Sequence, residues 1–177
     1  MRSRVSIRSK FPDFDEISYQ YAISVKSLSL FYSPINPEYY SEFQFYTNIE
    51  IEIEKEERLK ELENTSSMML LASIEALFHV DYLRRCYYRK RDALSRAFRE
   101  LYRRKHTQIS LEDELLELWK RNSNVTASLV GQIRGAFRYR HWLAHGRYWE
   151  PKLGQAYDFE SVHNLARAID NSFPFER

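Results

Sequence analysis

Residues 124–149 read NVTASLVGQIRGAFRYRHWLAHGRYW, and this stretch decides the fold class. Its apolar side chains recur at helical spacing, at Leu129, Val130, Ile133, Phe137 and Leu143. That spacing puts them on one side of a helix, the side that packs against a core. Asn124 precedes the run as a candidate N-cap, and Gly146 follows it where a helix commonly stops. The stretch therefore predicts a long amphipathic helix.

The same helical period continues on both sides of this stretch. We expect further helices over 13–32, 38–63, 68–105, 111–119 and 158–173, with 68–105 in one or two pieces. Within 38–63 the alternation from Ile49 to Glu54 also fits a strand, but the helix formers that follow favour a helix. Asn64–Ser67 offers N-caps for a helix that begins at Met68, and Asp158 offers one for the last helix.

Length and composition agree with this pattern. The chain has 177 residues, 44% of them hydrophobic, enough to bury a core without staples. Four Gly and five Pro are too few for the many turns of an all-β fold. The sequence predicts an all-α fold, a compact bundle of about five to six helices. We expect a basic arm over residues 1–12 and one helical domain over residues 13–177.

Several protein classes have no support in the sequence. The single cysteine, Cys86, excludes an internal disulfide framework and a cysteine-cluster zinc site, and a packing role is expected for it. The longest apolar run, Met68–Ala72, is far too short to span a membrane, and the N-terminus has no apolar signal segment. A soluble, cytoplasmic protein is therefore expected. There is no Walker loop, dinucleotide glycine fingerprint or GxSxG elbow.

The charges are segregated along the chain, although the formal net charge is only +2. Ten Lys or Arg occur from Arg84 to Lys105, against Asp92 and Glu100. Such a stretch indicates either contact with a polyanion, most commonly nucleic acid, or a solvated helix face. Seven Glu occur from Glu50 to Glu63, against three Lys or Arg. This acidic run is interpreted as a solvated face, or as mimicry that covers the basic stretch.

The end of the helix predicted from residues 124–149 carries a specific motif. Arg140 and His141 are followed by an apolar triplet, Trp142–Ala144, and then by His145 and Gly146. This pattern resembles the HEPN superfamily, whose ribonuclease members carry an Arg, a polar residue, three mostly apolar residues and a His. The resemblance covers about residues 65–175 by helix order and about seven residues by motif. Where the family usually has Asn after the Arg, this chain has His141.

Helical geometry constrains how these residues act together. His141 and His145 project from nearly the same side, about 40° apart, whereas Arg140 lies about 140° from His145. The negative end of the helix dipole repels phosphate, so cations must hold one there. Arg138, Arg140 and Arg147 are expected to supply them. The rings of Trp142, Tyr148 and Trp149 are expected to stack on unpaired bases.

Imidazole and guanidinium together suit RNA cleavage by attack of the 2′-OH on the adjacent phosphorus. We expect Arg140 and His145 to be catalytic, assisted by His141 as a proton-transfer group. Further contacts to the RNA backbone are expected from the basic stretch, including Arg84, Arg85 and Arg89. The resemblance implies the same chemistry, a homodimer in which two motifs face one cleft, and a role as a toxin of a toxin–antitoxin pair or as a phage-defence effector.

Two other functions fit the same residues. The first is a non-catalytic nucleic-acid or nucleotide-binding module, which in this family is often paired with a nucleotidyltransferase. The second is a partner-binding bundle in which Trp142, Tyr148 and Trp149 anchor a protein interface.

Glu75 is interpreted either as part of a polar stripe or as a residue that orients the motif Arg or His. Glu75, His79 and Asp81 lack the further ligand that a metal site needs, so no metal and no cofactor are expected.

Overall fold

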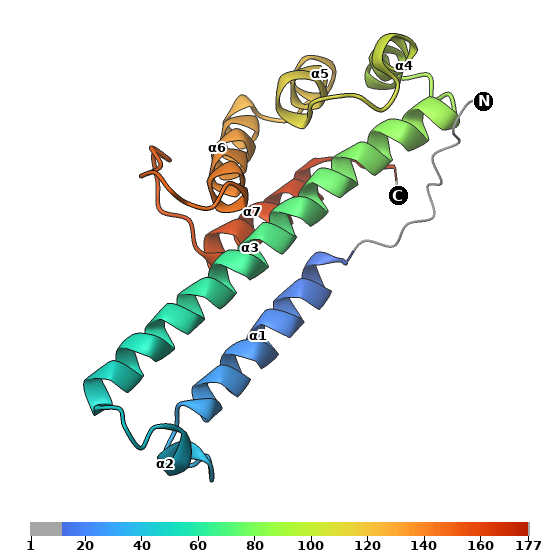
Figure 1. Cartoon of the computed structure of the whole chain (residues 1–177). Coiled ribbons are helices and arrows are strands. Elements are labelled where there is room, and N and C mark those ends of the chain that lie inside the picture. Colours follow the sequence, from blue (N-terminus) through green and yellow to red (C-terminus); the bar gives the residue numbers. More distant parts are fainter. Residues whose placement is uncertain (1–11, 177) are drawn as a thin grey trace, which may run out of the picture.

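The structure, a computed structural model, describes residues 12–176, so most of the predicted basic arm lies outside the described residues. The described chain is all-α, which confirms the predicted fold class (Figure 1). It contains seven α-helices and one π-helical turn, more than the five to six expected. They are α1 Phe14–Phe31, α2 Tyr39–Glu42, α3 Asn48–Tyr87, α4 Ala93–Lys105, η1 Leu111–Leu115, α5 Leu116–Asn122, α6 Ala127–Ala144 and α7 Phe159–Ser172.

The central element is α3, a single helix of 40 residues against which most other helices pack. The prediction that a helix begins at Met68 is wrong, because α3 runs through Asn64–Ser67 without a break. Asn64 Oδ1 accepts a hydrogen bond from the Tyr139 hydroxyl of α6 at 3.0 Å, and the Thr65 hydroxyl donates to the carbonyl of Glu61 at 2.9 Å. Asn64 and Thr65 are therefore engaged across the contact with α6 and within α3, and the backbone stays helical through all four residues.

Most predicted helix boundaries hold. Asp13 and Asp158 cap α1 and α7, and each receives a backbone hydrogen bond three residues on. The segment 68–105 is in two pieces, because the chain turns after Tyr87 and Asp92 caps α4. The expected cap at Asn124 is wrong, since Thr126 accepts the hydrogen bond from the Leu129 N–H at 3.2 Å.

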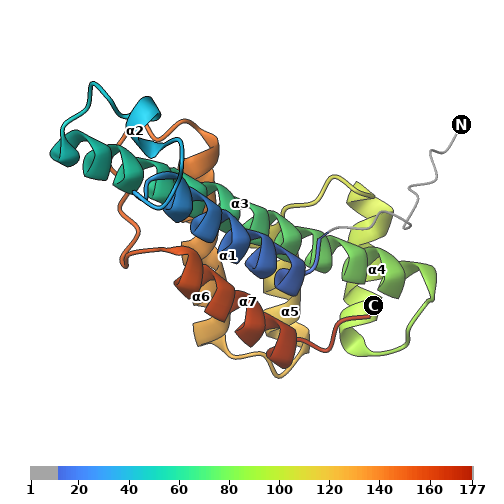
Figure 2. The ribbon, with the colours of Figure 1, turned by 90° about the horizontal axis from the view of Figure 1, so that it is seen from below.

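The main core lies where the C-terminal half of α3 meets α4 to α7. Its largest fully buried side chains include Phe78, Tyr82, Phe98 and Trp119. In Figure 2, α1 and α7 both run alongside α3. The N-terminal half of α3 extends beyond this core, paired with α1 and closed by α2. A second, small cluster of Tyr32, Phe43 and Ile51 holds that end together. No helix in the described part of the chain is long and apolar enough to cross a membrane.

Candidate active site

The motif lies across the C-terminal end of α6. The helix ends at Ala144, and His145 is its C-cap, with its N–H bonded to the carbonyl of His141 at 3.1 Å. Gly146 has a φ of +80°, the left-handed conformation that glycine adopts without strain. The chain then turns back, and the Arg147 N–H reaches the carbonyl of Trp142 at 3.3 Å. The motif is therefore held by a defined helix stop.

The two histidines of the motif lie together, as their spacing predicts. Their ring centroids are 4.2 Å apart at an interplanar angle of 51°, and both residues are exposed. The ring of Trp149 lies 6.1 Å from that of His141. The chain thus presents two imidazoles side by side at the surface, next to an indole.

Arg140 leaves α6 on the side that faces α3. Its guanidinium pairs with the carboxylate of Glu75 at 2.8 Å and lies 5.9 Å from the centroid of the Phe137 ring. About one third of each side chain of the ion pair is exposed. This is the contact expected if Glu75 orients the motif arginine. The structure does not bring Arg140 onto the same side of α6 as the histidines.

The chain after the motif is fastened back onto α6 and α3. The indole N–H of Trp142 donates to the carbonyl of Trp149 at 2.7 Å, and its ring stacks on Tyr139. Arg147 pairs with Glu61 of α3 at 2.6 Å. Trp142 is half-buried and held by these contacts, and its stacking on bases stays a prediction. Tyr148 is 84% exposed and lies edge-to-face with Trp149, which is half-buried.

A cationic stripe runs along the exposed side of α6. It consists of Arg134, Arg138, His141 and His145, spaced three or four residues apart. Arg134 is held by Glu117 at 2.6 Å, whereas Arg138 is exposed. Glu112 of η1 faces the same stripe. Burial raises the pKa of its carboxyl above the usual range and Asp113 adds to this, while the positive charges of Arg134, Arg138 and His141 oppose the shift.

The three arginines of the basic stretch that are predicted to contact RNA lie in different surroundings, and the prediction for Arg85 is wrong. Arg85 is only 6% exposed. Its guanidinium donates to Asp81 at 2.8 Å, to Ser95 at 3.3 Å and to the carbonyl of Pro174 at 2.6 Å. Arg85 therefore holds α3 to α4 and to the C-terminal segment, and it is not free to bind a phosphate. The prediction that it contacts RNA does not hold.

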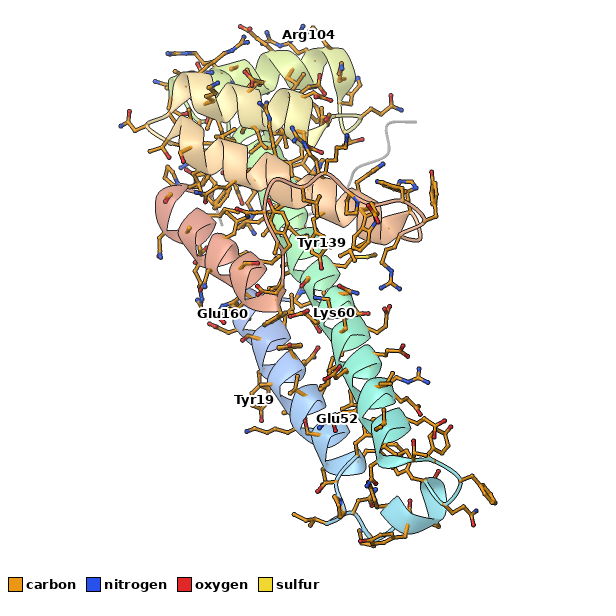
Figure 3. The ribbon with its side chains drawn as sticks, turned by 90° about the vertical axis from the view of Figure 1, so that its left-hand side faces the viewer. Tyr19, Glu52, Lys60, Arg104, Tyr139 and Glu160 are labelled. Atoms are coloured by element: carbon orange, nitrogen blue, oxygen red, sulfur yellow. The ribbon has the colours of Figure 1, made fainter. Side chains whose placement is uncertain are left out.

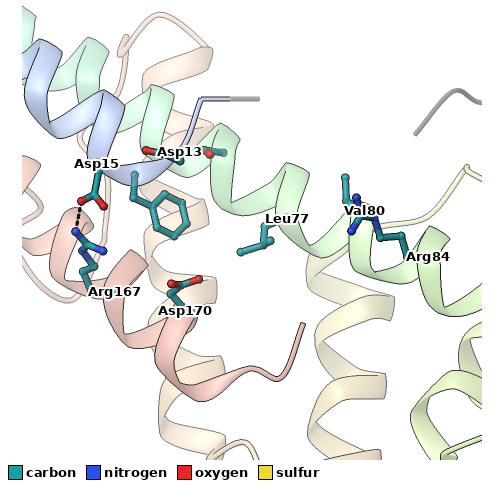
Figure 4. Close-up of a pocket in the computed structure, with 9 residues that line it drawn as sticks. Asp13, Asp15, Leu77, Val80, Arg84, Arg167 and Asp170 are labelled. Carbon is teal, nitrogen blue, oxygen red and sulfur yellow. Dashed lines mark hydrogen bonds and ion pairs between the residues drawn. The ribbon is translucent and has the colours of Figure 1, made fainter. Parts of the chain in front are cut away.

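Arg84 and Arg89 lie apart from the motif. Arg84 is nine residues from Glu75, which places it on the opposite side of α3. There it lines a cavity of about 350 Å³ between α1, α3 and α7, together with Asp13, Asp170 and Arg167 (Figure 4). Arg89 is exposed in the turn after α3, with a φ of +50°. Figure 3 shows the basic helix α4, marked by Arg104, at the end of α3 opposite to Glu52.

Other candidates are placed as follows. Burial raises the pKa of the Cys86 thiol to about 11, and Arg99 only partly offsets this, so the thiol is poorly reactive. Burial lowers the pKa of His79, which lies one helical turn after Glu75. Among residues 12–176 no three or more His, Cys, Asp or Glu side chains are grouped to hold a metal ion.

Sequence reasoning missed residues that hold the motif in place. Glu61 anchors Arg147, whereas the sequence predicts for its acidic run a solvated face or mimicry that covers the basic stretch. Tyr157 stacks on Tyr139 with ring centroids 5.2 Å apart. A Cβ at Gly135 would lie 2.5 Å from the Tyr157 hydroxyl, so the close approach needs glycine there. Gly135 inside the predicted helix is a signal of such packing, but Gly131 in the same helix has no atom within 4 Å of a Cβ, so the sequence alone could not distinguish the two.

Models of known protein families, curated proteins and solved structures were all compared with this chain, and none matches it.

Proposed function

We propose that this protein is a HEPN-type endoribonuclease that cleaves RNA without a metal ion, through His145, His141 and Arg140. The observation that supports the proposal most is the pair of exposed imidazoles at the end of α6, whose ring centroids lie 4.2 Å apart. Arg140 directly precedes His141 in the chain. Two imidazoles in contact supply a general base and a general acid at one site. Arginine supplies the positive charge that a phosphorane-like transition state needs.

The reaction has one displacement step. One imidazole takes the proton of the 2′-OH, and the 2′-oxygen forms a bond to the adjacent phosphorus. The bond from phosphorus to the 5′-oxygen breaks, and the other imidazole protonates the leaving oxygen. The products are a 2′,3′-cyclic phosphate and a 5′-OH. DNA is inert because it lacks the attacking hydroxyl.

The surroundings of the histidines suit a single-stranded substrate. Arg138 lies on the same stripe and is free to contact a phosphate next to the scissile one. Tyr148 and Trp149 offer ring faces to unpaired bases. The basic helix α4 is further from the motif, and we assign it to the outer part of the RNA backbone.

We also propose that the active form is a homodimer. One side of α3 next to the motif carries apolar or small residues, namely Met68, Met69, Ala72, Ala76 and Leu83. Met68, Met69 and Ala72 are exposed, the two methionines by about 40%, whereas Ala76 is half-buried and Leu83 packs partly against the main core. We call this side the α3 seam. In an antiparallel pair of seams, the acidic half of each α3 would lie against the basic end of the other.

The cellular role follows as part of the proposal. A small ribonuclease domain that needs no cofactor suits a toxin held by an antitoxin, or an effector of phage defence, in the cytoplasm. The competing function is a binding module that holds a nucleotide or RNA without cleaving it. The ion pair of Arg140 with Glu75 favours that alternative, because within one chain it turns the guanidinium away from the two imidazoles.

The test is cleavage of a mixed RNA pool in the presence of EDTA, with the ends of the products analysed for cyclic phosphate. The His145→Ala protein is expected to lose at least about 100-fold in rate while it keeps its RNA affinity. His106→Asn is the matched control, since His106 lies exposed beyond α4, far from the motif in the chain. If wild-type protein at concentrations that give a dimer binds RNA but leaves it intact, the binding module replaces the nuclease.

A further inference from the structure

The end of the molecule away from the main core carries an unusual number of exposed apolar side chains. The most exposed large ones are Ile35 at 82%, Phe45 at 88%, and Tyr40 and Ile49 at 73% each. All four lie in or next to the chain that connects α1 with α3. Single exposed apolar residues are ordinary, but four within residues 35–49 at one end of the molecule are typical of an interaction site.

This end has a fixed shape. The buried rings of Tyr32 and Phe43 stack with centroids 5.3 Å apart, and Phe31 contacts both edge-on. Thr47 caps α3 through the N–H of Glu50, which fixes where the chain re-enters a helix. The exposed side chains are therefore displayed from an ordered base.

A groove continues from this end along the arm. It lies between α1 and α3 and is lined by the apolar side chains of Ile23, Leu28, Phe31 and Leu62, together with Ser24, Ser27, Arg58, Glu61 and Thr65. Phe31 belongs both to this groove and to the aromatic group of the tip. We call the groove and the tip residues Ile35, Phe45 and Ile49 together the arm surface. Two antiparallel helices with an apolar groove between them suit a third helix as occupant.

The charge around the arm surface determines which kind of helix can bind there. Residues 26–63 contain nine Glu against four Lys or Arg. Three of those bases already pair with glutamates, namely Lys55 with Glu52, Arg58 with Glu54 and Lys60 with Glu63. The remaining negative charge repels RNA and anionic lipid and attracts a basic polypeptide. We infer that the arm surface binds a basic amphipathic helix of a protein partner.

A helix bound in the groove would also change the contacts of the chain next to the motif. Glu61 borders the groove and also anchors Arg147, two residues after His145. A Lys or Arg of the occupant that pairs with Glu61 competes with Arg147 and releases the chain after the motif. This regulatory consequence rests on the proposed ribonuclease function, whereas the binding itself does not.

The test measures binding without RNA, so its outcome is independent of cleavage. The probe is a fluorescein-labelled 18-residue amphipathic helix of leucine and lysine, compared by anisotropy with the same peptide carrying glutamate for lysine. The lysine peptide is expected to bind at least 10-fold more tightly. The triple variant Ile35→Ser, Phe45→Ser, Ile49→Ser and the groove variant Ile23→Glu are each expected to weaken it at least 10-fold. Tyr19→Ser, 70% exposed on α1 but outside the groove, is the matched control.

Unfolding midpoints check that each variant remains folded; the two binding variants act on different elements, so failure of one to fold leaves the other. Equal binding of the two peptides, or unchanged binding by both variants, overturns the inference. Phosphatidylserine vesicles that bind through the same residues would assign the surface to a membrane instead. Self-association in sedimentation that the triple variant abolishes would assign it to a second copy of this chain.

Discussion

Arginines that look alike in the sequence have different roles in the folded chain. Arg85 is buried in a network, Arg140 is paired with Glu75, and Arg138 is exposed on the cationic stripe. The difference comes from neighbours that are distant in sequence, such as the carbonyl of Pro174 for Arg85. Charge counts alone could not separate a structural arginine from one that is free to bind a phosphate.

Glu75 is expected to act as a positioning residue for Arg140. Glu75→Ala frees the guanidinium from its 2.8 Å partner, and we expect kcat for RNA cleavage to fall about 10-fold because the arginine loses its orientation. Glu75→Gln keeps a hydrogen-bond acceptor and should recover part of that loss, with KM nearly unchanged in both variants. Equal kcat for wild type and both variants would show that the ion pair has no part in catalysis.

Asp81 is expected to make stability depend on pH. Burial raises the pKa of its carboxyl to about 6, even though it accepts hydrogen bonds from Arg85 and from the N–H of Glu176. The unfolded chain releases this proton near pH 3.9, so between about pH 4 and 6 the folded state holds a proton that the unfolded state lacks. The contribution of Asp81 to the free energy of unfolding therefore falls as the pH rises through this range, by up to about 3 kcal/mol.

The measurement is urea unfolding of wild type and Asp81→Asn at several pH values from 4 to 7. The difference between their free energies of unfolding isolates the contribution of Asp81. Carboxylates with a lowered pKa, such as Glu114 and Asp92, contribute equally to both proteins, and their contribution to stability rises with pH instead of falling. A difference that does not change with pH would contradict the prediction.

Helix boundaries depended on which polar side chains found partners elsewhere. Asn64–Ser67 has the composition of a cap but lies inside α3, because Asn64 bonds to Tyr139 across the interface with α6. Thr126, not Asn124, caps α6. The cap expected at Asp158 is confirmed, because its side chain accepts the hydrogen bond of the Ser161 N–H.

Two glycines within α6 provide a matched comparison. Gly131 has no atom within 4 Å of where a Cβ would lie, so Gly131→Ala should raise the free energy of unfolding by about 0.5–1 kcal/mol. At Gly135 the Cβ would meet the Tyr157 hydroxyl at 2.5 Å, and the stacked Tyr139 limits any retreat of that ring. Gly135→Ala should therefore lower it by about 1–3 kcal/mol. Chemical denaturation measures both, and equal stabilisation would mean that Tyr157 moves aside freely.

At the scale of the whole molecule, α3 separates the charges. Its N-terminal half, with Glu52, is acidic, and its C-terminal end adjoins the basic helix α4 (Figure 3). The stretch between them carries the α3 seam. Within that stretch the charged side chains Glu75 and Asp81 are bonded to Arg140 and Arg85. An antiparallel pair of chains would bury the apolar seam and place the acidic half of each α3 against the basic end of the other.

A cysteine at the middle of the seam tests this arrangement. Ala72→Cys, in a Cys86→Ser background, should form a disulfide-linked dimer under mild oxidation, because Ala72 would lie near the two-fold axis. Tyr19→Cys in the same background is the control, as it lies exposed on α1, away from the seam. Non-reducing gels and sedimentation measure the outcome. A chain that sediments as a monomer and links no faster at Ala72 than at Tyr19 would contradict the dimer.

The sequence by itself determined the all-α fold, most helix boundaries and the pairing of His141 with His145. These features depend on spacing along one helix, where the period of 3.6 residues fixes which side chains are neighbours. Only the tertiary structure decided the continuity of α3, the burial of Arg85, the partners of Arg140 and Arg147, and the packing of Trp142. Those depend on contacts that the period of a single helix does not determine. Asn64 and Arg85 are buried polar groups whose partners lie on other elements, and Arg140 and Arg147 pair with glutamates of α3 nearer the surface. Trp142 is held by the carbonyl of Trp149, which the chain brings back beyond the end of α6.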